Sequence, residues 1–225
     1  MSDEIRLIQI KEDIMQDNES LADELRDSMK GKGTLLINLM SSPGSGKTTF
    51  LKATIEALKK KYRIGVIEAD IDSVVDAEAI QSLGVPAVQL QTGGFCHLDA
   101  AMTEKGVTAF GDDELDIIFI ENVGNLVCPA EFDTGATKNI MILSIPEGDD
   151  KPLKYPLMFT VTEALIISKM DYSSLSNFSM DKLTERVKKL NATMNIFPMS
   201  ALKGEGLEPW ISWLEAAVRE QKKAS

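Results

Sequence analysis

The chain has few soft metal ligands and a deficit of positive charge. Its 225 residues include two cysteines and one histidine, and 24 Lys and Arg oppose 35 Asp and Glu, for a net charge of −11. Two cysteines cannot build a disulfide framework, so a reducing cytoplasm is the expected location. The net negative charge argues against nucleic acid or an anionic membrane as the main partner.

Long apolar runs are also missing. No stretch approaches the roughly 20 residues that span a membrane, and the N-terminus shows no basic region followed by an apolar core, so no secretory signal is expected. What remains is an ordinary globular composition, 44% hydrophobic and 26% charged. This length favours one domain over residues 1–225, in which residues 1–30 form an N-terminal arm, favoured as a packed helix.

Residues 41–49 form the most informative motif, Ser-Ser-Pro-Gly-Ser-Gly-Lys-Thr-Thr. An apolar run (34–40) precedes it, Lys47 and Thr48 open a helix, and 50–61 continue as helix-like sequence. This strand, glycine loop and helix form the context of a phosphate-binding P-loop. Ser41 stands where the motif has its first glycine. The predicted nucleotide-binding residues here are Gly44, Ser45, Gly46, Lys47, Thr48 and Thr49.

Strands then alternate with helices along the chain, which predicts an α/β fold with a mostly parallel sheet and helices on both faces. The expected strands are 34–40, 63–69, 87–90, 116–121, 139–145, 164–168 and 193–198. The expected helices are 11–30, the one opened by Lys47, 76–83, 98–105, 179–190 and 207–222.

The P-loop and one later motif indicate which residues contact the phosphates. Lys47 is expected to reach the β- and γ-phosphates, and the Thr48 hydroxyl to ligate Mg²⁺. The strand ending at Ile120 leads into Glu121-Asn122-Val123-Gly124, an E-x-x-G version of the GTPase D-x-x-G motif. The Gly124 amide is expected to bind the γ-phosphate, and Glu121 to orient water or Mg²⁺ ligands.

The nucleotide base is expected to be guanine. Ser168-Lys169-Met170-Asp171 lies where GTPases carry Asn-Lys-x-Asp, with Ser168 in place of Asn, and Ser200-Ala201 follow the next strand. Asp171 would accept two hydrogen bonds from guanine, the Lys169 stem would cover the base, and the Ala201 amide would approach O6. A bidentate carboxylate contact rejects adenine. A P-loop kinase or another ATP-using enzyme is the alternative.

A second constellation contains every soft ligand of the chain. Cys96 and His97 are adjacent, and Cys128 lies four residues beyond Gly124. Two thiolates and an imidazole suit Zn²⁺ and also Ni²⁺, although each residue alone is more often simply buried. Cys96, just before an expected helix, is favoured as a thiolate. Three ligands leave the coordination sphere incomplete, which predicts a transfer site or a site shared across a homodimer.

Five segments together resemble the HypB family, the nickel-incorporation GTPases that help to mature [NiFe]-hydrogenase. They are Ser-Pro-Gly-Ser-Gly-Lys-Thr (42–48), Glu-Ala-Asp-Ile (68–71), Asp-Ala-Glu (76–78), Cys-His-Leu-Asp-Ala (96–100) and Glu-Asn-Val-Gly-Asn-Leu-Val-Cys-Pro (121–129). The resemblance runs from about Leu21 to the C-terminal helix. It implies a dimerising GTPase of the signal-recognition-particle/MinD-like (SIMIBI) class, with a metal at Cys96, His97 and Cys128 that responds to the nucleotide.

The resemblance also implies roles for acidic residues and partners. Asp70 and Asp76 match switch positions near Mg²⁺ and the γ-phosphate, so both are expected, with Lys47 and Glu121, to serve hydrolysis. Residues 147–150 resemble a family segment suited to nucleotide or dimer contacts. The implied partners are a second copy of the chain, a hydrogenase large subunit and a second accessory protein. No Cys or His precedes Cys96, so the nickel-storage motifs of some members are absent.

Three functions therefore remain open from sequence. The first is a GTP-hydrolysing nickel metallochaperone in which GTP and GDP impose different metal geometries, for [NiFe]-hydrogenase or for another nickel enzyme. The second is an ATP-using P-loop enzyme. The third is a GTP-dependent interaction switch with a structural zinc, whose metal would resist removal and hold the fold.

Overall fold

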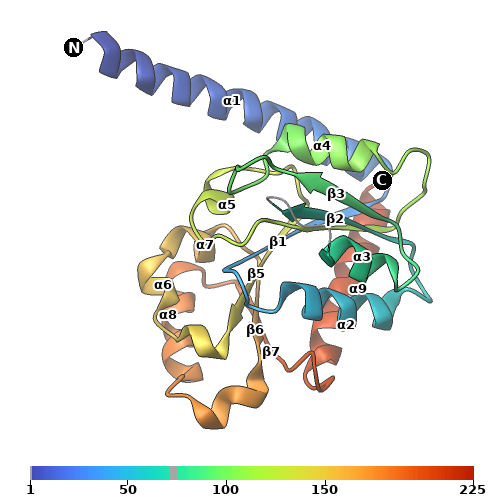
Figure 1. Cartoon of the computed structure of the whole chain (residues 1–225), viewed down its shortest axis with the longest axis vertical. Coiled ribbons are helices and arrows are strands. Elements are labelled where there is room, and N and C mark those ends of the chain that lie inside the picture. The colour runs from blue at the N-terminus through green and yellow to red at the C-terminus, as the bar shows by residue number, and fades with distance from the viewer. Residues whose placement is uncertain (1, 71–74) are drawn as a thin grey trace.

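The strands form one seven-stranded parallel sheet (Figure 1) in the order β3-β2-β4-β1-β5-β6-β7. The computed structural model describes residues 2–70 and 75–225, with side chains over 15–70 and 78–225. The strands are β1 (Leu35–Ser41), β2 (Ile64–Asp70), β3 (Ala87–Gln91), β4 (Ile117–Glu121), β5 (Lys138–Ser144), β6 (Ala164–Ser168) and β7 (Asn195–Pro198). Each predicted strand is confirmed to within two residues.

The parallel arrangement follows from strands that are apolar on both faces. Every residue of β1 is buried. Leu35, Ile37 and Leu39 face one hydrophobic cluster, whereas Leu36 and Met40 belong to clusters on the opposite face. β1 lies in the middle of the sheet and pairs with β4 on one side and β5 on the other. The strand that enters the P-loop therefore lies at the centre of the sheet with every residue buried.

Helices cover both faces of the sheet, as predicted. They are α1 (Ser2–Gly31), α2 (Lys47–Leu58), α3 (Val75–Gln81), α4 (Ala100–Thr108), α5 (Cys128–Glu131), α6 (Lys151–Lys154), α7 (Pro156–Thr160), α8 (Met180–Leu190) and α9 (Leu207–Ala224), with 3₁₀ turns η1 (Ile145–Glu147) and η2 (Met170–Leu175). Residues of α2, α3 and α9 pack on one face, and residues of α1, α4, α7 and α8 on the other. In the described part of the chain, no helix combines the length and apolar character needed to cross a membrane.

Several helix boundaries differ from the prediction, and α4 spans Ala100–Thr108 where residues 98–105 were expected. α1 begins at Ser2 rather than residue 11, α2 ends at Leu58 rather than residue 61, and α5 to α7 were not expected. These three helices have four or five residues each, too few to show a helical period in sequence. Each nevertheless has a proline in its first turn, where proline's fixed φ favours helix initiation.

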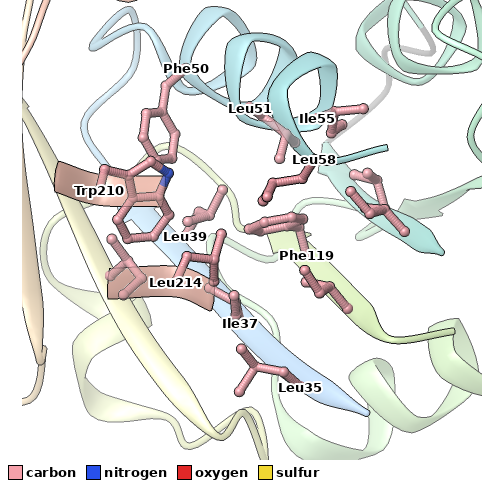
Figure 2. Close-up of a cluster of buried hydrophobic side chains, with 14 of the residues drawn as sticks. Leu35, Ile37, Leu39, Phe50, Leu51, Ile55, Leu58, Phe119, Trp210 and Leu214 are labelled. Atoms are coloured by element: carbon pink, nitrogen blue, oxygen red, sulfur yellow. The ribbon is translucent and has the colours of Figure 1, made fainter. Parts of the chain in front are cut away.

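The core beneath the P-loop helix contains the residues drawn in Figure 2. Phe50, Leu51, Ile55 and Leu58 of α2 pack against β1, Phe119 of β4 and two residues of α9, Trp210 and Leu214. The Trp210 ring centroid lies 5.2 Å from that of Phe50, and its indole Nε1 donates a hydrogen bond to Thr54 Oγ1 at 3.0 Å. α9 therefore fixes α2, and with it the start of the P-loop helix, on the sheet.

We expect Trp210→Ala to lower the free energy of unfolding by about 3–5 kcal/mol, because a fully buried indole leaves a large cavity. Urea denaturation followed by circular dichroism would measure this. Trp213→Ala is the matched control, since Trp213 stacks on Trp210 but is only partly buried. A loss from Trp213→Ala equal to or larger than that from Trp210→Ala would contradict the role given to Trp210.

The carboxyl ends of all seven strands meet at one edge of the sheet, because the strands are parallel. β1, β4, β6 and β7 there lead into the segments that carry Lys47, Gly124, Asp171 and Ser200, and β3 leads into the Cys96 segment. Ligands of open parallel sheets bind outside this edge, where neighbouring strands lead to opposite faces. The fold thus brings together motifs that lie far apart in the chain.

Candidate nucleotide and metal sites

The P-loop leaves β1 at Ser41 and ends in the first turn of α2. Gly44 (φ 72°) and Gly46 (φ 97°) adopt left-handed backbone conformations that favour glycine. Gly46 is the N-cap of α2, and no side chain hydrogen-bonds there. The first amides of α2 are therefore available to an anion. A cavity of about 590 Å³ opens beside them, bounded by the P-loop, Asp70, Glu121, Gly124 and Lys169.

Ser41, which replaces the first glycine of the motif, anchors the P-loop lysine. Lys47 Nζ donates a hydrogen bond to Ser41 Oγ at 3.0 Å, and Ser45 Oγ donates to the same atom at 2.7 Å. Ser41 Oγ in turn donates to the Ser42 carbonyl. The departure from the glycine pattern therefore supplies a buried hydroxyl that holds Lys47 at the edge of the cavity.

Oxygen ligands for a hard cation lie beside Lys47. Thr48 Oγ1 donates a hydrogen bond to Glu121 Oε1 at 3.0 Å, and Asp70, the last residue of β2, lines the same cavity. Hydroxyl and carboxylate oxygens are the ligands that Mg²⁺ prefers, so these residues fit a magnesium ion. Asp76, also predicted here, lies in α3, but its side chain is outside the described residues.

Glu68 is a carboxylate that the sequence analysis missed. It is 3% exposed, and its register partner in the sheet is Glu121, which is 4% exposed. The rest of β2 and β4 is apolar, apart from Asp70 at the end of β2. The signal in the sequence was a single acid within the apolar run of β2, two residues before Asp70.

The loop that carries Gly124 lies directly against the P-loop. A Cβ atom added at Gly124 would lie 3.1 Å from both the Cα and the N of Pro43. Such contacts are closer than ordinary van der Waals packing, so the glycine allows the two loops to touch. Gly124 also lines the nucleotide cavity. A γ-phosphate held by the P-loop would therefore lie at the residue predicted to sense it.

The base-reading segments converge on the other side of the P-loop. Ser168 Oγ donates to the Ser45 carbonyl at 2.6 Å, and Lys169 Nζ donates to the Gly44 carbonyl at 2.7 Å. Ser168, which replaces Asn, therefore ties the end of β6 to the P-loop.

The predicted base-reading carboxylate is also held in place. Ser200 Oγ donates to Asp171 Oδ1 at 2.7 Å, and this hydrogen bond lowers the pKa of Asp171. Ala201 follows Ser200 directly. Residues that follow β6 and β7 thus come together where the guanine was expected.

The segment after η1 contacts the P-loop too. Glu147 accepts hydrogen bonds from the Ser42 hydroxyl and from the backbone amide and hydroxyl of Ser144. Asp149 accepts from the Ser179 amide and pairs with Arg186 of α8. Residues 147–150, which the sequence analysis associated with nucleotide or dimer contacts, therefore connect the P-loop to α8.

Cys96, His97 and Cys128 form a cluster at the same edge of the sheet. One ligand atom from each lies within 4.8 Å of the other two. The Cys96 Sγ to Cys128 Sγ distance is 2.9 Å, and Cys96 Sγ lies 3.9 Å from His97 Nδ1. Two sulfurs on one tetrahedral zinc are about 3.7 Å apart at Zn–S bonds of about 2.3 Å. A movement below about 1 Å would therefore admit a zinc ion of this geometry.

Metal binding at the cluster is coupled to the release of a proton. Burial lowers the pKa of His97, so its imidazole is neutral and able to ligate near pH 7. The hydrogen bond with Cys96, together with burial, raises the pKa of the Cys128 thiol. A bound metal ion must displace this proton, because the thiolate is the ligand.

Two further features distinguish this site from the prediction. The Phe132 ring, which the sequence analysis missed, stacks on His97 with centroids 3.9 Å apart and fixes the imidazole plane. Its signal was an aromatic residue four positions after Cys128. The predicted helix after Cys96 begins at Ala100, not Leu98, and the Asp99 side chain caps it. The helix therefore starts four residues after Cys96, with the Asp99 carboxylate at its N-cap.

Comparison with known families identifies relatives of this arrangement. The family described as "CobW/HypB/UreG, nucleotide-binding domain" matches residues 35–198. "Hydrogenase maturation factor HypB" of Escherichia coli strain K12 is 42% identical over 210 residues, which cover 93% of this chain and 72% of that protein. "Hydrogenase/urease maturation factor HypB" of Helicobacter pylori strain J99 is 41% identical over 217 residues, covering 95% of this chain and 89% of that one.

Solved structures with a similar fold agree with these relatives. HypB from Helicobacter pylori in complex with nickel superposes with a TM-score of 0.86 at 40% identity, covering 92% of this chain and 97% of that one. The signal recognition particle receptor FtsY from Elizabethkingia anophelis superposes with a TM-score of 0.53 at 15% identity, covering 80% of this chain and 66% of that one. The second likeness concerns the fold alone.

Proposed function

Because this chain belongs to the HypB family of CobW/HypB/UreG nucleotide-binding proteins, we propose that it is a GTP-hydrolysing nickel metallochaperone that serves the maturation of a nickel enzyme, [NiFe]-hydrogenase. One observation carries the proposal. Two thiols and an imidazole lie within 4.8 Å of one another, and Cys128 is only four residues from the glycine that lines the phosphate cavity. A nucleotide-dependent loop thus contains a ligand of the cargo metal.

Hydrolysis is assigned to the P-loop edge of the cavity. Lys47 leaves Ser41 to bind the β- and γ-phosphate oxygens, and the α2 amides and the Gly124 amide orient the γ-phosphate for in-line attack by water. Glu121, buried beside Thr48, orients the attacking water or the cation ligands. Bound Mg²⁺, held by Thr48 with Asp70 or Asp76, would neutralise phosphate charge. Asp171, with Lys169 and Ala201, selects guanine.

Metal delivery is assigned to the loss of the γ-phosphate. Hydrolysis removes the anchor of the Gly124 amide, and the loop that continues to Cys128 then relaxes. With Cys128 displaced, Cys96 and His97 hold the ion with two ligands, which weakens binding and favours transfer. GTP thus stabilises one coordination of nickel and GDP another.

The proposed partners follow the same chemistry. A second copy of the chain would complete the coordination sphere, and Phe95 and Val127, which flank the cysteines, are large apolar residues that are 56% and 49% exposed. The remaining partners are a hydrogenase large subunit and a second accessory protein, in the cytoplasm. Urease is a second candidate client, because the Helicobacter relatives are named hydrogenase/urease maturation factors.

The alternative proposal is a GTP-dependent interaction switch with a structural zinc. The donor set of two sulfurs and one nitrogen supports it, because zinc binds such sites as readily as nickel does. The two proposals differ in lability. A structural ion holds the fold and resists chelators, whereas a cargo ion leaves without unfolding the protein.

The test is a titration of the purified chain with Ni²⁺ and Zn²⁺ in GDP and in a non-hydrolysable GTP analogue, with stoichiometry and oligomer mass recorded. We expect GTP but not ATP to be hydrolysed, nickel affinity to depend on the nucleotide, and chelation to leave the fold intact. Lys47→Ala is the control, in which phosphate release is expected to disappear. Equal nickel binding in both nucleotide states, or zinc that leaves only on unfolding, would overturn the proposal.

A further inference from the structure

We infer that Asn122 is the positioning residue through which the nucleotide site and the metal site are coupled. This inference rests on the proposed function and names the side chain that connects its two sites. Asn122 is fully buried, with no exposed surface. Its Oδ1 accepts a hydrogen bond from the backbone amide of Leu98 at 3.3 Å, and Leu98 directly follows the metal ligand His97. The segment from Cys96 to Ala100, called the metal segment below, is thus attached to the Glu121–Gly124 loop by the Asn122 side chain. The same loop also continues along the chain to Cys128.

The other side of the Asn122 amide faces the P-loop strand. Its Nδ2 donates to Asn38 Oδ1 of β1 at 3.0 Å, and Asn38 Nδ2 donates to Asn139 Oδ1 of β5 at 3.0 Å. Asn38 lies three residues before Ser41, at which the P-loop begins. The three amides form a chain of hydrogen bonds, buried at Asn38 and Asn122, that runs from the central strands to the metal segment.

Neighbouring side chains at the end of β4 point to opposite faces of the sheet, as strand geometry requires. Glu121 contacts Thr48 of α2 on the nucleotide face. Asn122 contacts Leu98, which packs in the cluster on the other face. A displacement of this short segment by the γ-phosphate therefore acts on both faces at once. The sheet edge supplies the two-sided contact that coupling between two sites requires.

Asn125 reinforces the connection closer to the metal. Its Nδ2 donates a hydrogen bond to the Cys96 carbonyl oxygen at 3.5 Å, and its Oδ1 accepts one from the Val127 amide at 2.8 Å. Asn122 lies two residues before Gly124, and Asn125 directly follows it. The segments of all three ligands therefore depend on five consecutive residues, Glu121 to Asn125.

The experiment measures the ratio of nickel dissociation constants in GDP and in a non-hydrolysable GTP analogue. Couplings between sites change affinity about 5- to 150-fold. We expect a wild-type ratio in this range and, in Asn122→Ala, a ratio within about twofold of one, because the metal segment no longer follows the loop. By reciprocity, nickel should stop changing the affinity for the analogue. Thermal melting checks that the variant is folded, and Asn125→Ala, less buried, takes its place if it is not.

Asn18→Ala is the matched control. Asn18 of α1 also holds the metal segment through its amide, since it accepts from the Ala100 amide and donates to the Asp133 carbonyl, both at 2.9 Å. Within the described part of the chain, the side-chain hydrogen bonds of Asn18 reach neither β1 nor the Glu121–Gly124 loop. We expect this variant to change nickel affinity equally in both nucleotide states and to keep the ratio.

The outcomes separate the two claims. A wild-type ratio of one overturns the proposed function itself. A wild-type ratio different from one that persists in folded Asn122→Ala overturns only the role of Asn122, and so does a ratio that Asn18→Ala abolishes equally well. In the last case, any loosening of the metal segment would be sufficient to uncouple the sites.

Discussion

Replacing Cys128 with alanine is expected to weaken nickel binding by about 100- to 1000-fold, because one of three ligands is lost. Structural zinc sites gain about 10–16 kcal/mol from four ligands, so each ligand contributes about 2.5–4 kcal/mol. Titration with Ni²⁺, followed by calorimetry and by the thiolate-to-nickel absorption band, would measure the loss. The two sulfurs lie 2.9 Å apart and are hydrogen-bonded. Removing Cys128 should therefore also leave the Cys96 thiol without this hydrogen-bond partner.

Val127→Ala is the control, because it alters the adjacent exposed residue and removes no ligand. Its nickel affinity should match that of the wild type. Nickel binding that survives Cys128→Ala at full strength would mean that the ion binds elsewhere in the chain, and the metal site described above would be incorrect.

The same experiment has an expected pH dependence. The hydrogen bond with Cys96 and burial raise the pKa of Cys128, so protons compete with the metal over the neutral range. Apparent nickel affinity of the wild type should therefore increase as pH rises from about 6 to 8. The increase should be less steep in Cys128→Ala, which has one thiol proton fewer to release.

Replacing Asp171 with asparagine is expected to lower GTP affinity by about 100- to 10 000-fold. The carboxylate can accept from both guanine N1–H and N2–H₂, whereas an amide would oppose one of these donors with its own NH₂. Two hydrogen bonds to a charged group, each about 1.5–3 kcal/mol, set this range. Xanthosine triphosphate, which presents an oxygen at position 2, should become the better ligand. Displacement of a fluorescent nucleotide would measure the affinities for GTP and for xanthosine triphosphate.

Asp181→Asn provides the same chemical change at an exposed position in the first turn of α8 and should leave nucleotide binding unchanged. Nickel affinity without nucleotide should be unaltered in Asp171→Asn, which would show that the variant is folded. Preferential ATP binding by the wild type, unaffected by Asp171→Asn, would instead support the ATP-using alternative.

Much of this architecture was accessible from local sequence patterns. The apolar strands predicted the parallel sheet because strands buried on both faces form nearly continuous apolar runs, and all seven were located to within two residues. The short helices α5 to α7 could not be predicted, because four or five residues do not complete enough turns to show a period. The start of α4 was placed two residues early because its cap, Asp99, follows an apolar Leu98 that resembles a helix residue.

The site divides in the same way. The kinds of chemistry are properties of residue type and spacing, so the P-loop, the Lys169–Asp171 motif and the soft ligands Cys96, His97 and Cys128 could be named from the chain alone. Which of these residues lie together in the folded protein could not be predicted from the chain alone. Cys96 and Cys128 are 32 residues apart in sequence, and only the order of β3, β2 and β4 at the sheet edge brings their sulfurs to 2.9 Å.

The structure was also needed to find what the residues that depart from the family patterns do. From sequence, Ser41 and Ser168 were only mismatches, yet their hydroxyls hold Lys47 and the Ser45 carbonyl. Asn122 and Asn38 carried no functional signal, because a polar residue in an apolar strand acquires meaning only through its partner. The sequence by itself determined which reactions this protein can support, since chemistry belongs to side chains. The tertiary structure decided which of them act together, because hydrogen bonds and metal ligation extend over only a few ångströms.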